Sequence, residues 1–113
     1  MSKDSAVYLK HIKDECAYLL SISGKNFSKE LFLQDETLKR AVVRSLEIIG
    51  EATKKVPADY KASRDYIKWK NMAGMRDRLI HDYMGVNYAI VWDVLKNKIP
   101  ELFHQINQAL EEE

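Results

Sequence analysis

The stretch from Met75 to Tyr83, Met-Arg-Asp-Arg-Leu-Ile-His-Asp-Tyr, gathers side chains that can carry acid–base and phosphate chemistry. The guanidinium groups of Arg76 and Arg78 can each form two parallel hydrogen bonds with a phosphate. The imidazole of His81 can exchange a proton near neutral pH. A base and a cation suffice, in principle, to cleave RNA without a metal. The base takes a ribose 2′-hydroxyl proton, the oxygen attacks the adjacent phosphorus, and the cation stabilises the phosphoryl charge.

The spacing of these residues on a helix constrains how they can cooperate. At about 100° per residue, Arg76 and Tyr83 lie nearly on one face, whereas Arg76 and His81 diverge by about 140° and are about 7.5 Å apart along the axis. One helix therefore does not aim both side chains at one small target, and a symmetric dimer that brings in a second copy is favoured. The alternative is a solvated helix face with Asp77 and His81 as an i,i+4 pair. Composition and spacing alone favour that alternative.

The other residues with chemical potential receive ordinary interpretations. His11 and His104 lie among charged neighbours and are expected at the surface. Cys16 is the sole cysteine, which excludes an internal disulfide and a cysteine-based zinc site, and we expect it in the core. Trp69 and Trp92 are expected to pack rather than to stack on bases. No glycine-rich phosphate loop or paired-histidine motif is present, so neither a cofactor nor a metal is expected.

Apolar residues that recur every three or four positions predict an all-α fold, an antiparallel up-and-down bundle of four long helices in one domain, residues 1–113. Gly50 costs its helix about 1 kcal/mol relative to alanine, which favours close passage of another helix backbone there. Pro100 should kink or split the last helix, which Asn87 is expected to cap. The predicted long helices cover residues 4–22, 35–56, 64–84 and 87 to near the C-terminus, with a short turn in 26–34 and a polar connection at 57–63.

Composition narrows the classes of partner. The formal net charge of +1 argues against a broad basic surface that binds long nucleic acid, so DNA is not an expected partner. A local basic pocket is compatible with this net charge. No apolar run approaches the roughly 20 residues that span a bilayer, so no membrane association is expected. The N-terminus leads into a charged segment unlike a signal peptide, and the expected location is cytoplasmic.

The Arg76-x4-His81-x-Tyr83 pattern resembles the signature of HepT-like proteins in the HEPN superfamily. The resemblance extends from Lys39 to Leu102, more than half of the chain, in the same order and at similar spacing. An Arg-x4-His match alone is a weak signal, whereas the whole arrangement is specific. Its further parts are Arg44-Ser-Leu-Glu-Ile-Ile-Gly-Glu-Ala52, Trp69, Gly74 to Tyr83, Val91-Trp92 and Ile99-Pro-Glu-Leu102.

The resemblance implies a homodimeric helical bundle with two copies of the motif around a shared cleft. It implies a metal-independent endoribonuclease toxin of a type VII-like toxin–antitoxin pair, acting on RNA. On that analogy His81 handles the proton, Arg76 holds the scissile phosphate, and Asp77 supports one of them. The partner would be an MntA-type nucleotidyltransferase antitoxin that transfers AMP from ATP to Tyr83. Adenylylation would place bulk and negative charge beside Arg76 and exclude an RNA phosphate.

Two other functions remain open at this point. The chain could be a non-catalytic helical binding module that docks a nucleotidyltransferase, or a helical dimer with a structural role. The presence of the arginine, the histidine and the tyrosine argues against a purely structural role. Loss of RNA cleavage on replacing Arg76 or His81 would separate the enzyme from the docking module.

Overall fold

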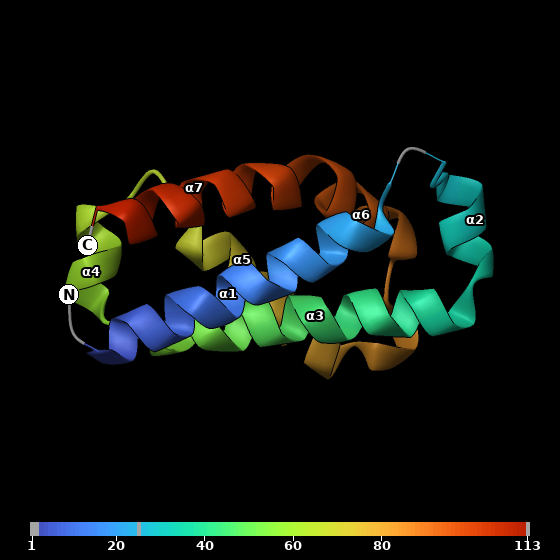
Figure 1. The fold of residues 1–113 in the computed structure, drawn as a ribbon. Helices are drawn as coiled ribbons and strands as arrows, with labels where there is room; N and C mark the ends of the chain where they lie inside the picture. Colours follow the sequence, from blue (N-terminus) through green and yellow to red (C-terminus); the bar gives the residue numbers. More distant parts are fainter. Residues whose placement is uncertain (1–2, 25, 113) are drawn as a thin grey trace.

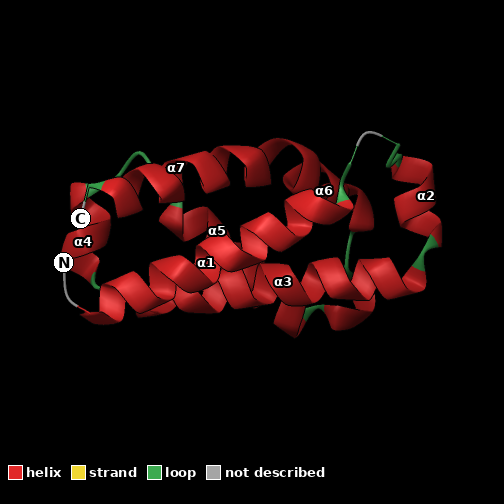
Figure 2. Cartoon of the chain, in the orientation of Figure 1, coloured by secondary structure: helices red, strands yellow, loops and turns green. Residues whose placement is uncertain are grey.

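A computed structural model describes residues 3–24 and 26–112 of the chain. Its centre is α1 (Lys3–Ile22), which packs against both α3 (Glu36–Lys55) and α7 (Ile99–Glu111) (Figure 1). Helix α5 (Trp69–His81) packs on α3. Within the described ranges the secondary structure is entirely helical, with short loops between the helices (Figure 2). The all-α prediction is therefore confirmed.

Two short helices lie at opposite ends of this arrangement (Figure 1). Helix α2 (Lys29–Gln34) begins after Ser28, whose hydroxyl accepts a hydrogen bond from the Leu31 amide. Asp35 caps α3 in the same way, through the Leu38 amide. Helix α4 (Ala58–Ser63) lies at the end where α1 begins and α7 finishes. In the part of the chain that is described, no helix is both long and apolar enough to traverse a lipid bilayer.

The prediction of a polar connection at residues 57–63 was wrong, because most of that segment is α4. Tyr60 is 8% exposed and meets the ring of Trp69 edge-on, at 6.4 Å between centroids. This contact with a residue outside the segment stabilises a short helix of which half the residues are polar.

The helix predicted over residues 64–84 is shorter, because α5 begins at Trp69 and ends at His81. Before it, the Ile67 amide bonds to the Arg64 carbonyl in a turn, and this turn buries Ile67 to 2% exposure. After it, Asp82 leaves helical geometry with φ −112° and ψ 39°. A 3-10 turn, η1 (Tyr83–Gly85), follows.

The interruption predicted at Pro100 takes the form of a wider helical turn. Helix α6 (Tyr88–Asp93), capped by Asn87, leads into a π-helical turn, η2 (Val94–Lys98), and then into α7. Proline has no amide hydrogen and is tolerated in the first turn of a helix, which is where Pro100 lies in α7. The Ile99 amide bonds back to the Val94 carbonyl, so the chain continues without a break.

The core confirms the expectations for the cysteine and for the two tryptophans. Cys16 is fully buried, and burial, with a smaller contribution from Glu15, raises the pKa of its thiol to about 12. Trp69 is 7% exposed, and its indole Nε1 donates a hydrogen bond to the Arg64 carbonyl. Trp92 is half-buried and packs against Phe27 and Phe32. His11 and His104 are exposed, as predicted.

Candidate functional site

The site begins with Gly50, where α3 and α5 cross at close range. A Cβ atom at this glycine would lie 2.2 Å from the Arg76 Cβ and 2.7 Å from the Met72 carbonyl oxygen. Both distances are too short for a real contact, so only glycine permits this approach. The prediction that another helix passes close to Gly50 is confirmed. The residue that lies against it is Arg76.

Arg76 is held on two sides. The base of its side chain lies against Gly50, and its Nη1 donates a hydrogen bond to Asp77 Oδ1 at 3.1 Å. A quarter of the side chain remains exposed. Its Nε is buried and has no hydrogen-bond partner among the described residues. A buried donor that stays unpaired costs about 1–3 kcal/mol.

Lys54 of α3 joins this arrangement from the other helix. Its Nζ donates a hydrogen bond to Asp77 Oδ1, the same oxygen that accepts from Arg76. The bond to Lys54, and then the one to Arg76, hold the pKa of the Asp77 carboxyl below its usual value of 3.8. Asp77 is therefore a carboxylate near neutral pH and stands between two cations.

Lys54 was not among the residues that the sequence assigned to the site. The available signal was its position one turn after Gly50, on the same side of α3. That signal becomes useful only once the partner helix at Gly50 is known to be the one that carries Arg76 and Asp77. The predicted supporting role of Asp77 is consistent with the two hydrogen bonds that it accepts.

His81 lies apart from Arg76 in the single chain. It is the last residue of α5, and its side chain is exposed. In the described part of the chain His81 does not form the i,i+4 ion pair with Asp77 that the alternative interpretation contained. Within the same ranges it also forms no hydrogen bond with Arg76. The separation of about 140° that the helix imposes between Arg76 and His81 accounts for the absence of a contact between those two side chains.

Tyr83 follows two residues later, in the 3-10 turn η1. The turn is closed by the Gly85 amide, which donates to the Asp82 carbonyl at 2.8 Å. The expected modification concerns the side chain of Tyr83, which lies outside the described part of the structure.

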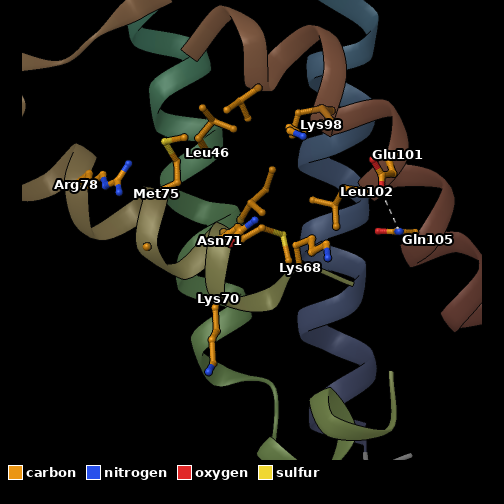
Figure 3. Close-up of a pocket in the computed structure, with 15 residues that line it drawn as sticks. Leu46, Lys68, Lys70, Asn71, Met75, Arg78, Lys98, Glu101, Leu102 and Gln105 are labelled. Carbon is orange, nitrogen blue, oxygen red and sulfur yellow. Dashed lines mark hydrogen bonds between the residues drawn. The ribbon is translucent and has the colours of Figure 1, made fainter. Parts of the chain in front are cut away.

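The opposite side of α5 borders a groove of about 410 Å³. Arg78 lies along this groove and is exposed, unlike Arg76 (Figure 3). The two arginines are two residues apart, so the helix directs them about 160° away from each other. Over residues 3–24 and 26–112, no three acidic, histidine or cysteine side chains converge in a way that could hold a metal ion.

Comparison with known proteins finds a family and relatives that are named as ribonucleases. Residues 8–109 match the family described as ribonuclease HepT-like. A protein of Caldanaerobacter subterraneus named as a candidate RNase is 48% identical over 106 residues, 94% of each chain. A protein of Thermococcus cleftensis named "Probable ribonuclease HepT" is 41% identical over 102 residues, 90% of this chain and 92% of its own. No solved structure matches the chain.

Proposed function

This chain belongs to the HepT-like ribonuclease family, and from that membership and the setting of Arg76 we propose that it is a metal-independent endoribonuclease. The observation that carries the proposal is the fixed position of Arg76, between Gly50 and the Asp77 carboxylate, with a quarter of its side chain exposed. A pre-positioned cation stabilises developing phosphoryl charge without reorganising during the reaction. The biological role that we propose is that of the toxin in a type VII-like toxin–antitoxin pair.

In the proposed reaction His81 acts as the base. It accepts the proton of a ribose 2′-hydroxyl, and the 2′-oxygen forms a bond to the adjacent phosphorus. The bond from phosphorus to the 5′-oxygen then breaks, and that oxygen takes a proton from water as it leaves. Arg76 binds the non-bridging phosphoryl oxygens as their charge increases. The products are a 2′,3′-cyclic phosphate end and a 5′-hydroxyl end.

A second copy of the chain completes the proposed site, because Arg76 and His81 point in different directions within one copy. The end of α5 and the turn after it expose apolar side chains that suit a close neighbour. Ile80 of α5 and Met84 of η1 are 37% and 88% exposed. We propose that a symmetric dimer covers these side chains and combines Arg76 of one copy with His81 of the other.

The proposed control is adenylylation of Tyr83 by an MntA-type nucleotidyltransferase antitoxin. The Tyr83 phenol oxygen would bond to the α-phosphorus of ATP and release pyrophosphate. The backbone of Tyr83 lies in the turn that directly follows His81, so AMP added there would bring a negative charge next to the catalytic histidine. That charge would repel an RNA phosphate.

One observation favours a second candidate, the non-catalytic module that docks a nucleotidyltransferase. In the single chain Arg76 is already paired with Asp77, and His81 makes no hydrogen bond to it. If no dimer forms, the two groups cannot act on one phosphate, and docking would be the remaining role of this surface.

Cleavage of labelled RNA in excess EDTA tests the proposal. We expect the wild-type protein to leave 2′,3′-cyclic phosphate ends and both Arg76→Ala and His81→Ala to be inactive. His104→Ala, which removes another exposed histidine, is the matched control and should cleave normally. Intact mass measured on the same samples shows whether AMP is present on the protein. Cleavage by His81→Ala equal to that by wild type would overturn the assigned roles, and inactivity of an unmodified wild-type dimer would favour the docking module.

A further inference from the structure

A groove separates α5 from α7 on the side of α5 opposite Gly50. Its volume is about 410 Å³, and both helices line it, together with α3 and η2 (Figure 3). It forms because α5 packs on α3 while α7 packs on α1, which leaves a space between the two outer helices.

The floor of the groove is apolar. Leu46 and Ile49 of α3, Met72 and Met75 of α5, and Leu102 of α7 contribute to it. Leu46 and Ile49 are almost fully buried, so these side chains form a fixed surface. The two methionines are half-buried and adapt easily to a flat ligand. A floor of this kind can hold one face of a planar ring.

The rim of the groove is predominantly cationic. Lys68, Arg78 and Lys98 lie along it, and Figure 3 shows Arg78 and Lys98 on opposite sides. In the part of the chain that is described, none of these three forms an ion pair. Glu101 is the one acidic residue in the lining and accepts a hydrogen bond from Gln105 at 3.3 Å. The charge of the rim therefore suits an anionic ligand with an apolar, ring-shaped part.

The groove lies next to the proposed catalytic histidine. Arg78 and His81 are three residues apart on α5, which places them within about 60° of each other around the helix. A strand with its reacting phosphate at His81 can thus extend along α5 past Arg78. Arg76 is on the other side of the helix and does not reach the groove.

We propose that this groove binds one nucleotide of single-stranded RNA adjacent to the scissile phosphate. The base lies on the apolar floor, and Arg78 and Lys98 contact the flanking phosphates. This proposal rests on the ribonuclease function proposed above. Apolar contact with a base face and cationic contact with the backbone are the two general means by which proteins hold single strands, and both tolerate different base sequences.

Two substrates separate this subsite from the chemistry. One is a pool of random hexaribonucleotides, which are long enough to reach the groove. The other is a pool of random dinucleoside monophosphates, which contain the scissile phosphate and no flanking phosphates. Lys98→Ala should lower kcat/KM on the hexanucleotides by about fivefold. It should also reduce the slope of log kcat/KM against log salt concentration by about 0.7, the value for one lost phosphate contact on a single strand. On the dinucleotides its kcat/KM should equal that of wild type.

Lys96→Ala is the matched control, because Lys96 is in the same π-helical turn, carries the same charge and does not line the groove. It should leave kcat/KM on both substrates unchanged. Equal kcat/KM values for the Lys98 and Lys96 variants on hexanucleotides would overturn the proposal. An equal loss on both substrates would also overturn it, since the effect would then be on the chemistry or the fold. A sedimentation mass halved only in Lys98→Ala would overturn it by identifying the groove as an interface between copies.

Failure of the proposed function can be distinguished from failure of this inference. Binding of fluorescein-labelled hexanucleotides is measured by anisotropy with His81→Ala as the background, with either Lys98→Ala or Lys96→Ala added. Weaker binding confined to the Lys98 variant supports the groove even if the wild-type protein cleaves nothing. Equal binding by all three proteins overturns it even if the wild-type protein is an active nuclease.

Discussion

The two sides of α5 place the same residue type in opposite settings. On the Gly50 side, the stem of Arg76 lies against α3 and its guanidinium shares Asp77 with Lys54. On the groove side, two residues along the same helix, Arg78 is exposed and lines the groove. Position on the helix and the neighbouring helix, rather than residue type, therefore decide which arginine is fixed. A fixed cation suits transition-state stabilisation, and a mobile one suits attraction of a flexible strand.

The largest expected difference between the two sides is catalytic. Arg76→Lys keeps the charge but loses the planar pair of donors, and we expect its single-turnover cleavage rate to fall by about 100-fold or more. Arg78→Lys should stay within about threefold of wild type, because an exposed contact depends mainly on charge. Quench-flow or gel assays on one RNA measure both rates. Equal losses in the two variants would remove the functional distinction between the two sides of α5.

The next effect concerns stability. Gly50→Ala introduces a methyl group 2.2 Å from the Arg76 Cβ, so α3 and α5 must separate. We expect the unfolding free energy to fall by about 1–3 kcal/mol, the usual range for overpacking, despite alanine's greater helix propensity. Urea denaturation followed by circular dichroism measures the change. A midpoint equal to that of wild type would show that the crossing is looser than this structure has it.

Gly74, which lines the groove side of α5, should respond in the opposite direction. Gly74→Ala meets no atom within 4 Å, and we expect it to raise the unfolding free energy of the isolated chain by about 0.5–1 kcal/mol. Urea unfolding at several protein concentrations measures the change and keeps any contribution of association separate. A stability loss at concentrations where the chain is monomeric would contradict the open setting of Gly74.

These contrasts show what the sequence could and could not predict. The long helices, the cap at Asn87 and the close passage at Gly50 depend on local spacing, and they were predicted. Helix α4 was missed because it depends on Tyr60 packing against Trp69, which belongs to the next helix. The late start of α5 has a similar origin, since the burial of Ile67 stabilises a turn where periodicity favoured a helix.

In the candidate site, too, the residues of one segment were predicted, and the residue that depends on tertiary packing was not. Arg76, Asp77 and His81 were selected by residue type and by a family resemblance, both of which are read along one segment. Lys54 was missed because its part in the site depends on which helix crosses α3 at Gly50, and this is a tertiary fact. The prediction of a shared site between two copies remains a prediction, although the 140° divergence that motivated it is retained in α5.

The smallest expected effect is the pH dependence of the carboxylate that joins the two helices. Lys54, and then Arg76, lower the pKa of Asp77 in the folded protein, so the charged carboxylate stabilises the fold. This contribution is fully present above the ordinary pKa of 3.8 and is lost as the pH falls from there through the lower folded value. Asp77→Asn should therefore be slightly less stable than wild type at pH 7, and the difference in urea midpoint should vanish in strong acid.

Glu36→Gln is the matched control, because Lys39 lowers the pKa of Glu36 at a surface site away from α5. Both variants should show the same acid dependence of stability, but only Asp77→Asn should alter RNA cleavage, because only Asp77 contacts Arg76. Normal cleavage by Asp77→Asn at every pH would mean that packing against Gly50 alone positions the arginine.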